Sequence, residues 1–258
     1  MNRRQAIWAT AATLAGSALS FRRPAAEAAA TDRATIAMLL YPGFTALDLV
    51  GPHHVFSALE GFKVELVAKT ADPVSSDLGL SIKPTATLAQ CPQDVAVLFV
   101  PGGTTGTVRM MEDRQVLDFL KSRGETATWV TSVCTGALVL GAAGLLRGYR
   151  ATTHWGAIDV LEKLGATPVR ERAVQDRNRF TGGGVTAGID FALSLAAKLK
   201  DERYAKWVQL VMEYSPAPPF KSGTPAEAGA ELTTITEAMF VPFVASATAA
   251  AERARNSW

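Results

Sequence analysis

The chain has 258 residues, of which 48% are hydrophobic and 19% are charged, a size and composition that suit one large globular domain or two smaller ones. No apolar run approaches the roughly 20 residues of a membrane-spanning helix. The formal net charge is +2, but without residues 1–30 the chain has 22 basic residues against 23 acidic ones. No basic excess is left to indicate nucleic-acid binding.

The first 30 residues have the features of an export signal. Met1–Gln5 (MNRRQ) is a short basic region with an Arg pair, and Ile7–Leu19 is uncharged and mostly small or apolar. Ala26–Ala28 and Ala28–Ala30 offer small-residue cleavage sites. The Arg pair resembles a twin-arginine signal, although an ordinary secretory signal or an uncleaved anchor also fits. We expect a periplasmic or otherwise exported protein, without stable membrane association once residues 1–30 are removed.

From residue 31 onward, strand-like and helix-like segments alternate. Strand candidates are continuous apolar runs or alternate apolar with polar residues, whereas helix candidates have apolar residues at helical spacing. In chain order we predict a strand at Ala34–Tyr41, a helix at Thr45–Leu59, a strand at Lys63–Lys69, a short antiparallel excursion at Leu80–Leu88, a strand at Asp94–Val100, a helix at Asp113–Ser122, a strand at Thr128–Val133, a helix at Thr135–Gly141, a helix at His154–Leu164, a short strand pair around Thr167–Phe180 and a helix at Gly188–Lys200.

Apolar strands separated by helices predict an α/β fold with a mainly parallel sheet covered by helices on both faces. The Pro-rich segment Tyr214–Pro225 is the only loop-like stretch of this length within it. We therefore expect one domain at residues 31–225 and a helical C-terminal extension at residues 226–258.

The two cysteines are predicted not to pair with each other, which leaves Cys134 a free thiol unless it pairs between chains. Cys91 precedes a predicted strand and Cys134 follows another, so in a parallel sheet they lie on the order of 20 Å apart, one strand length. A disulfide needs Cα atoms within about 7 Å of each other.

Cys134 is the strongest candidate for a catalytic residue. The chain leaves a buried strand at Val133, meets Cys134 and enters a helix through Thr135, Gly136 and Ala137. A tight strand-to-helix turn presents its central side chain at the edge of the sheet, and small residues permit the bend. The helix N-terminus is expected to lower the pKa of the thiol and favour the thiolate nucleophile. A buried structural cysteine is the alternative.

Two segments that follow other strands could assist this cysteine. Gly102 and Gly103 end the neighbouring strand, where their amides could stabilise an anion, although paired glycines often mark only a turn. Asp48 is a single acid among apolar neighbours. Held near Cys134 in an apolar pocket, its carboxyl group would have a raised pKa and could transfer protons, but a helix cap or an exposed acid fits the sequence equally well.

The remaining candidates are less specific. His154 lies near the start of a predicted helix, where capping or packing is as good an interpretation as catalysis. The segment Thr181–Gly184 could bind an anion or form a tight turn. No metal-binding, Walker or dinucleotide-binding motif is present, so we expect neither a metal nor an organic cofactor.

Taken together, these segments resemble the ThiJ/PfpI superfamily, and within it the bacterial isonitrile hydratases. The matching segments are Asp48–His53 (DLVGPH), Pro101–Thr104 (PGGT), Thr131–Gly148 (TSVCTGALVLGAAGLLRG), Ala151–Trp155 (ATTHW), Thr181–Gly184 (TGGG), Ala187–Leu193 (AGIDFAL) and Glu213–Phe220 (EYSPAPPF). The resemblance runs in order from about Ala34 to Pro225, and the part from about Ala226 matches poorly.

The resemblance implies a flavodoxin-like three-layer sandwich with a cysteine nucleophile elbow, in a homodimeric enzyme that hydrates a small isonitrile to an N-substituted formamide without a cofactor. Cys134 would be the nucleophile, with Asp48 and Thr135 assisting. Gly51, Gly102, Gly103 and His154 are the expected contacts to substrate or oxyanion.

Other activities of the superfamily are alternatives. A glyoxalase or deglycase could use the same cysteine, and a redox sensor could form a sulfenic acid on it. Proteolysis is disfavoured because the proteases of this superfamily place His directly after the cysteine, where this chain has Thr135. A DNA-binding regulator would need a further domain after the Pro-rich loop.

Overall fold

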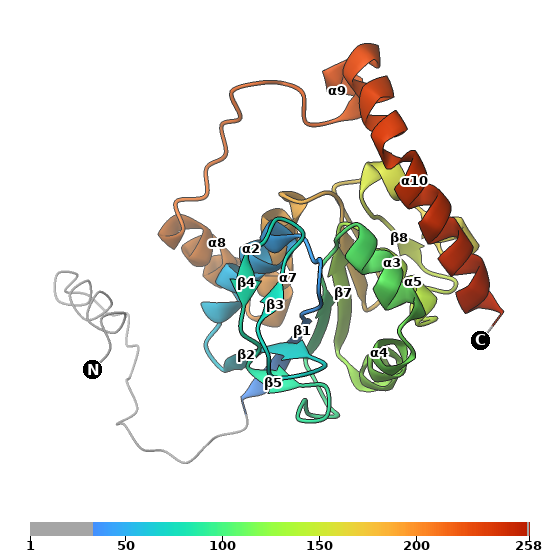
Figure 1. Ribbon diagram of the computed structural model, residues 1–258. Helices are drawn as coiled ribbons and strands as arrows, with labels where there is room; N and C mark the ends of the chain where they lie inside the picture. The colour runs from blue at the N-terminus through green and yellow to red at the C-terminus, as the bar shows by residue number, and fades with distance from the viewer. Residues whose placement is uncertain (1–32, 257) are drawn as a thin grey trace, which may run out of the picture. The chain divides into compact units, whose positions relative to one another are not determined.

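A seven-stranded sheet lies at the centre of the computed structural model, which describes residues 33–256 and 258 (Figure 1). Its strand order is β10-β11-β7-β6-β1-β2-β5, and every neighbouring pair is parallel except the β10–β11 hairpin. The strands are β1 (Ala34–Leu39), β2 (Phe62–Ala68), β5 (Ala86–Thr87), β6 (Val97–Val100), β7 (Trp129–Val133), β10 (Ala173–Asp176) and β11 (Arg179–Gly182). The predicted mainly parallel sheet is confirmed, while the export signal predicted at residues 1–30 lies outside the described residues.

Helices cover both faces of this sheet and make three layers. One group, α2, α7 and α8, packs together, and a second group is formed by α3, α4, α5, α6 and α10; Figure 1 shows the two groups on opposite sides of the strands. The helices are α2 (Ala46–Ser57), α3 (Thr105–Glu112), α4 (Arg114–Thr126), α5 (Gly136–Ala142), η2 (Trp155–Ala157), α6 (Val160–Lys163), α7 (Ala187–Leu199), α8 (Glu202–Val211), α9 (Pro225–Ala228) and α10 (Ala230–Arg255). Two-stranded pairs are formed by β3 (Val74–Ser75) with β4 (Ser81–Ile82) and by β8 (Arg150–Ala151) with β9 (Thr167–Pro168).

Three aromatic rings join α2 and α7 to the sheet. Phe56 of α2, Phe99 of β6 and Phe191 of α7 are fully buried, with ring centroids 6.1–6.3 Å apart. Aromatic contacts of this kind add to the free energy gained by burying the rings. They hold α2, whose first turn carries Asp48, against the strand that leads to Gly102.

The strand register brings three chain segments to one edge of the sheet. Val100 of β6 pairs with Ser132 of β7, and Val133 of β7 pairs with Gly182 of β11. The residues that follow these strands therefore begin side by side at the carboxyl edge, where ligands commonly bind in open α/β sheets.

Several elements differ from those predicted. The predicted helix at His154–Leu164 is divided into η2 and α6, and helices α3 and α8 were not predicted. Helix α3 contains Thr107 and Gly106, which are poor helix formers. Gly106 is required by packing, because a Cβ atom there would lie 2.6 Å from the carbonyl oxygen of Pro42. Around Thr167–Phe180 the predicted strand pair exists, but its second strand, β11, also joins the central sheet beside β7.

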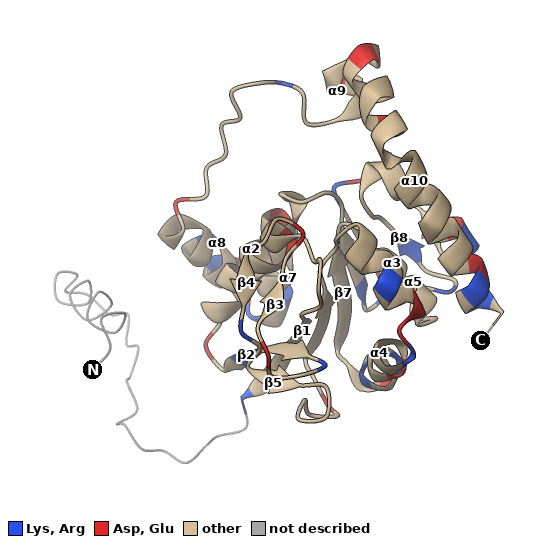
Figure 2. Ribbon diagram, in the orientation of Figure 1, with Lys and Arg blue, Asp and Glu red and all other residues tan. Residues whose placement is uncertain are grey.

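Residues 33–258 form one compact unit that includes the C-terminal extension. Helix α10 contacts α3, α5 and α6 through buried alanines of its C-terminal half, while the N-terminal half has exposed Leu232, Ile235 and Met239. In Figure 2 this helix is mostly tan between its charged ends. By length and composition alone α10 could cross a membrane, contrary to our expectation that no segment of the chain is apolar enough to do so.

Candidate active site

Cys134 lies on a strained turn between β7 and α5. Its φ angle is +54°, a left-handed conformation that non-glycine residues rarely adopt. Two hydrogen bonds to the Cys134 backbone fix this turn: the Cys134 amide donates to the carbonyl oxygen of Gly183 at 2.8 Å, and the Thr153 side-chain hydroxyl donates to the Cys134 carbonyl at 2.8 Å. Gly136 has no Cβ atom because one would collide with the carbonyl oxygen of Val100. The predicted cysteine elbow is therefore present.

Asp48 is buried next to Cys134, which the sequence alone could not establish. Its Oδ2 atom accepts a hydrogen bond of 3.0 Å from the Gly102 amide, while Oδ1 is buried without a hydrogen-bond partner among the described residues. A Cβ atom on Gly102 would lie 2.7 Å from Asp48 Oδ2, 2.7 Å from the Thr135 nitrogen and 2.8 Å from Cys134 Cβ. Asp48, Cys134 and Thr135 therefore enclose Gly102, and only glycine fits between them.

The Thr135 side chain belongs to a buried hydrogen-bond network. Its hydroxyl donates to the Gly103 carbonyl at 2.6 Å and accepts from the Gly103 amide at 2.9 Å. It also lies 2.9 Å from the Thr107 hydroxyl, which in turn lies 3.2 Å from that of Tyr41; Tyr41 donates to the Pro101 carbonyl at 2.8 Å. This network fixes the loop after β6 beside the cysteine. The hydroxyl of Thr135 is thus occupied by Gly103, and it is the backbone amide of Thr135 that faces the sulfur.

Burial raises the pKa of both the Asp48 carboxyl and the Cys134 thiol. Burial raises the pKa of Asp48 from 3.8 to about 7, although contact with the thiol and the Gly102 amide opposes the shift. Burial also raises the pKa of Cys134 well above 9.0, and the Asp48 charge raises it further, while the amides of Thr135 and Val185 oppose these effects. Our expectation of a lowered thiol pKa is wrong, because desolvation outweighs the amides that point at the sulfur.

The glycines predicted to contact substrate have other partners. The amide of Gly102 donates to Asp48 and that of Gly103 donates to Thr135, so neither is free to bind an oxyanion. Gly51 lies where α2 crosses α7, and a Cβ atom there would lie 3.1 Å from Ile189 Cγ1. Gly51 therefore permits α2 and α7 to pack closely against each other.

His154 lies near the site but has a capping role. Its Nδ1 accepts a hydrogen bond of 3.2 Å from the Gly156 amide at the start of η2, and burial lowers its pKa. Its ring lies 4.8 Å from that of Phe240 on α10, measured between centroids. A Cβ atom on Gly184 would lie 3.2 Å from His154 Cδ2, so the imidazole supports the loop that leads to the Val185 amide. This agrees with the capping and packing interpretation.

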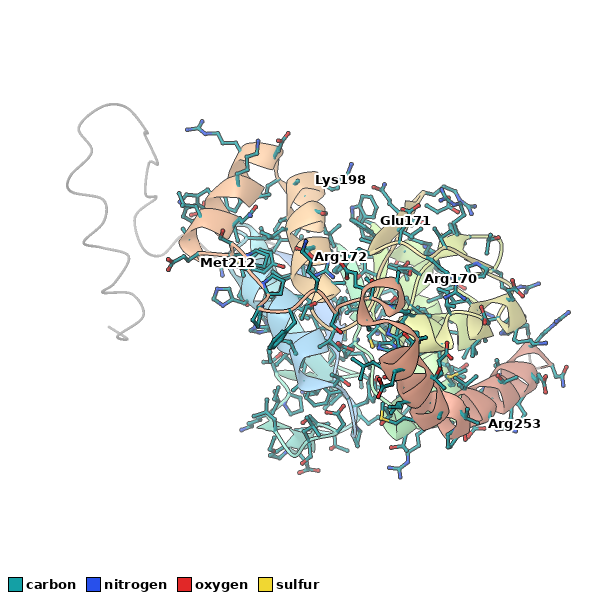
Figure 3. All side chains as sticks on the ribbon, turned by 90° about the horizontal axis from the view of Figure 1, so that it is seen from above. Arg170, Glu171, Arg172, Lys198, Met212 and Arg253 are labelled. Atoms are coloured by element: carbon teal, nitrogen blue, oxygen red, sulfur yellow. The ribbon has the colours of Figure 1, made fainter. Side chains whose placement is uncertain are left out.

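A pocket of about 480 Å³ adjoins the loop that holds the cysteine. Gly183 and Thr153, which bond to the Cys134 backbone, line it together with Trp155 and Ile158. Gly223 and Thr224, at the end of the segment that joins α8 to α9, line one side together with the first residues of α9. Figure 3 shows Arg172 beside this segment. The size of the pocket is within the usual range for a small-molecule site.

Sequence reasoning missed four residues that shape the site: Tyr41, Thr107, Thr153 and Val185. A polar residue within an apolar run was the only available signal for Tyr41, whereas the backbone amide of Val185 leaves no sequence signal at all.

Cys91 and Cys134 are both free and buried. In the described part of the chain, no group of three or more His, Cys, Asp or Glu side chains could hold a metal ion.

The fold and the site define a protein with a buried cysteine at the carboxyl edge of a parallel sheet, next to a buried carboxyl group. The model of the DJ-1/PfpI family matches residues 34–198, and the chain belongs to this family.

Individual relatives extend the similarity. The isonitrile hydratase of Pseudomonas putida is 55% identical over 190 residues, which are 74% of this chain and 82% of that protein. The crystal structure of a ThiJ/PfpI family protein from Pseudomonas syringae matches with a TM-score of 0.84 and 48% identity, covering 90% of this chain and 98% of that one. A deglycase of Pyrococcus horikoshii is 26% identical over 136 residues, or 52% of this chain and 81% of that protein.

Proposed function

We propose that the protein is an isonitrile hydratase, which adds water to an isonitrile and releases an N-substituted formamide. The observation that carries the proposal is the Asp48 carboxyl, whose pKa of about 7 suits proton transfer, directly beside the Cys134 thiol. The 55% identity to the hydratase of Pseudomonas putida supports the same reaction.

In the first half of the reaction, Asp48 takes the thiol proton of Cys134, and the thiolate attacks the terminal carbon of the isonitrile. A C–S bond forms, and protonated Asp48 returns its proton to that same carbon. The product is a thioimidate on Cys134, and the carboxylate is regenerated. The amides of Thr135 and Val185 point at the sulfur and stabilise its negative charge before attack.

In the second half, the Asp48 carboxylate removes a proton from water, and hydroxide adds to the thioimidate carbon. The proton passes to the nitrogen, which gives a tetrahedral adduct. The adduct loses its hydroxyl proton to Asp48 as the carbonyl forms and the C–S bond breaks. Formamide leaves, and Asp48 returns the proton to the thiolate, which restores the resting pair. No metal or organic cofactor takes part, so dialysis against EDTA should leave the rate unchanged.

The test is formamide production from cyclohexyl isocyanide by the wild type, Cys134→Ala and Cys91→Ala. Cys134→Ala should lose at least about 10³-fold in turnover, because it lacks the nucleophile. Cys91 is the matched control, since it is the other free and buried cysteine. Turnover that survives in Cys134→Ala, or no turnover by folded and reduced wild type, would remove the proposal.

The similarity to the Pyrococcus deglycase favours a second candidate, a glyoxalase or deglycase that uses the same cysteine. Methylglyoxal consumption, measured in parallel on the same variants, separates the two reactions. A redox sensor would instead show peroxide modification of Cys134 without turnover, and the raised pKa of the thiol disfavours it because oxidation follows thiolate character.

We also propose that the enzyme is an exported homodimer. The exposed apolar side chains Leu232, Ile235 and Met239 on α10 support a second copy as partner. Light scattering on the purified protein should give twice the mass of the chain, and the Ile235→Glu variant should give a lower mass.

Cell fractionation should place the wild-type protein outside the cytoplasm. If the twin-arginine route is used, replacing Arg3 and Arg4 by Lys should retain the protein in the cytoplasm.

A further inference from the structure

We propose that a second pocket, formed by Arg147, Arg255 and Trp258, binds the phosphate group of a soluble small molecule. The pocket has a volume of about 720 Å³ and lies at the C-terminal end of α5, whereas Cys134 precedes the N-terminal end of that helix. Its lining is completed by Gly144, Gly148, Gly165 and Glu162. This inference concerns a different part of the molecule from the cysteine and does not depend on the proposed reaction.

The glycines explain why a hollow exists here. Gly144, Gly148 and Gly165 have φ angles of +77°, +70° and +75°, which favour glycine and leave the turns without side chains. At Gly148 a Cβ atom would have no neighbour within 4 Å, so the space beside it is open. The backbone of these turns thus forms part of the pocket wall.

Arg147 is held in place from one side. Its guanidinium carbon lies 4.7 Å from the centre of the Trp258 ring, and the Trp258 indole nitrogen donates to the Ala142 carbonyl at 3.1 Å. The indole is thereby fixed to the end of α5, and the arginine that stacks on it loses little further freedom when a ligand binds.

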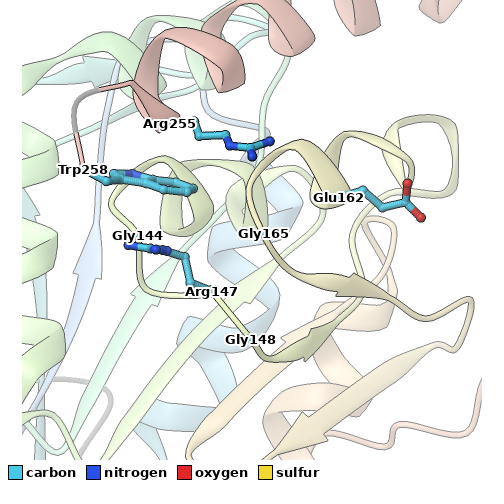
Figure 4. Close-up of a pocket in the computed structure, with 7 residues that line it drawn as sticks. All are labelled: Gly144, Arg147, Gly148, Glu162, Gly165, Arg255 and Trp258. Atoms are coloured by element: carbon cyan, nitrogen blue, oxygen red, sulfur yellow. The ribbon is translucent and has the colours of Figure 1, made fainter.

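Arg147 and Arg255 have no Asp or Glu side chain within salt-bridge distance in the described part of the chain. Both side chains are exposed. Glu162 also lines the pocket, but Figure 4 shows its carboxylate pointing away from the two guanidinium groups. Arg255 lies in the last turn of α10, where a cation offsets the partial negative charge of the helix end.

Arg253 shows that an arginine can stabilise the C-terminal end of α10 while it is paired with an acidic residue. It lies in the same last turn, and its guanidinium donates to Glu112 at 2.8 Å through Nε. Arg253 is paired, whereas Arg255 faces the pocket without an anion. Two guanidinium groups with planar arrays of donors match the oxygens and the double charge of a phosphate group better than the single charge of a carboxylate.

The test is calorimetric titration of the full chain with inorganic phosphate at physiological ionic strength, with acetate as the carboxylate comparison. We expect saturable phosphate binding, tighter than acetate, with affinity reduced about tenfold in Arg255→Gln and in Arg147→Gln. Arg253→Gln is the matched control, because it removes the same charge from the same helix turn, and it should bind phosphate as the wild type does. Thermal unfolding of each variant checks that it is folded.

Three outcomes would overturn the proposal. The first is no saturable binding up to roughly tens of millimolar phosphate, a range in which even weak specific sites fill. The second is an equal loss of affinity in Arg253→Gln, which would indicate attraction to general positive charge. The third is binding of the chain to phosphatidylglycerol vesicles without binding to phosphate, which would assign the arginines to a lipid surface.

Discussion

The two ends of helix α5 present opposite kinds of environment. Before its N-terminus, Cys134 and Asp48 are buried, and the neighbouring amides of Gly102 and Gly103 donate hydrogen bonds to buried side chains. At its C-terminus, Arg147 and Arg255 are exposed and have no acidic partner in the described residues. Burial at the first end shifts pKa values and prepares proton transfer, whereas exposure at the second leaves charge available to a ligand from solvent.

The largest effect that tests this contrast is expected at the buried carboxyl. Asp48→Asn should lower turnover at least about 100-fold, because the amide cannot shuttle the proton between sulfur, carbon and water. In the wild type the rate should rise with pH through about 7, where Asp48 ionises and becomes able to accept the thiol proton.

The pH profile of turnover is the measurement, with the exposed Asp72→Asn as control. That rise should be missing from the residual activity of Asp48→Asn. A pH profile with the same midpoint in the wild type and in Asp48→Asn would assign the titration to a group other than Asp48.

The same carboxyl predicts a dependence of stability on pH. Burial raises the pKa of Asp48 from 3.8 to about 7, so the folded state holds this proton more tightly than the unfolded chain does. The contribution of this raised Asp48 pKa to the free energy of unfolding is fully present below pH 4 and is lost as the pH rises through 7. Urea denaturation from pH 4 to pH 8 should show this decline in the wild type, and a wild-type slope retained in Asp48→Asn would contradict it.

A smaller effect is expected in the network that supports the site. Thr135→Val removes the hydroxyl that accepts a hydrogen bond from the Gly103 amide and contacts the Thr107 hydroxyl. The substitution therefore leaves buried polar groups without partners. We expect a loss of about 1–3 kcal/mol in the free energy of unfolding, measured by urea denaturation. Thr135→Ser keeps the hydroxyl and should lose clearly less, and equal losses in the two variants would show that the methyl group matters more than the hydrogen bonds.

The smallest effect is expected at the exposed end. Arg253→Gln breaks an ion pair with Glu112 in which both side chains are largely accessible to water, at 61% and 43%. Solvent screening limits such a pair to about 1 kcal/mol or less. A loss comparable to that of Thr135→Val would mean that α10 depends on this pair for its attachment to α3, and would weaken the distinction between the two regions.

Much of the fold could be predicted because its signals are local. The apolar strands at Ala34–Tyr41 and Asp94–Val100 stand out by composition, and the small residues after Cys134 mark the elbow. The missed helix α3 and the divided helix at His154–Leu164 are segments in which packing outweighs propensity. For example, glycine is required at position 106 because the Pro42 carbonyl lies too close for a Cβ atom. Pro42 is 64 positions away in the sequence, so the local pattern around Gly106 does not indicate this contact.

The sequence by itself determined the parallel sheet, the position of Cys134 at the end of a strand and the family, because these depend on composition and order along the chain. Only the tertiary structure decided that Asp48 lies beside the sulfur, that the Gly102 and Gly103 amides are already occupied, and that the pKa of the thiol is raised. The physical reason is that desolvation and hydrogen bonding depend on which distant segments meet. Burial is a property of the assembled layers, and no single segment carries it.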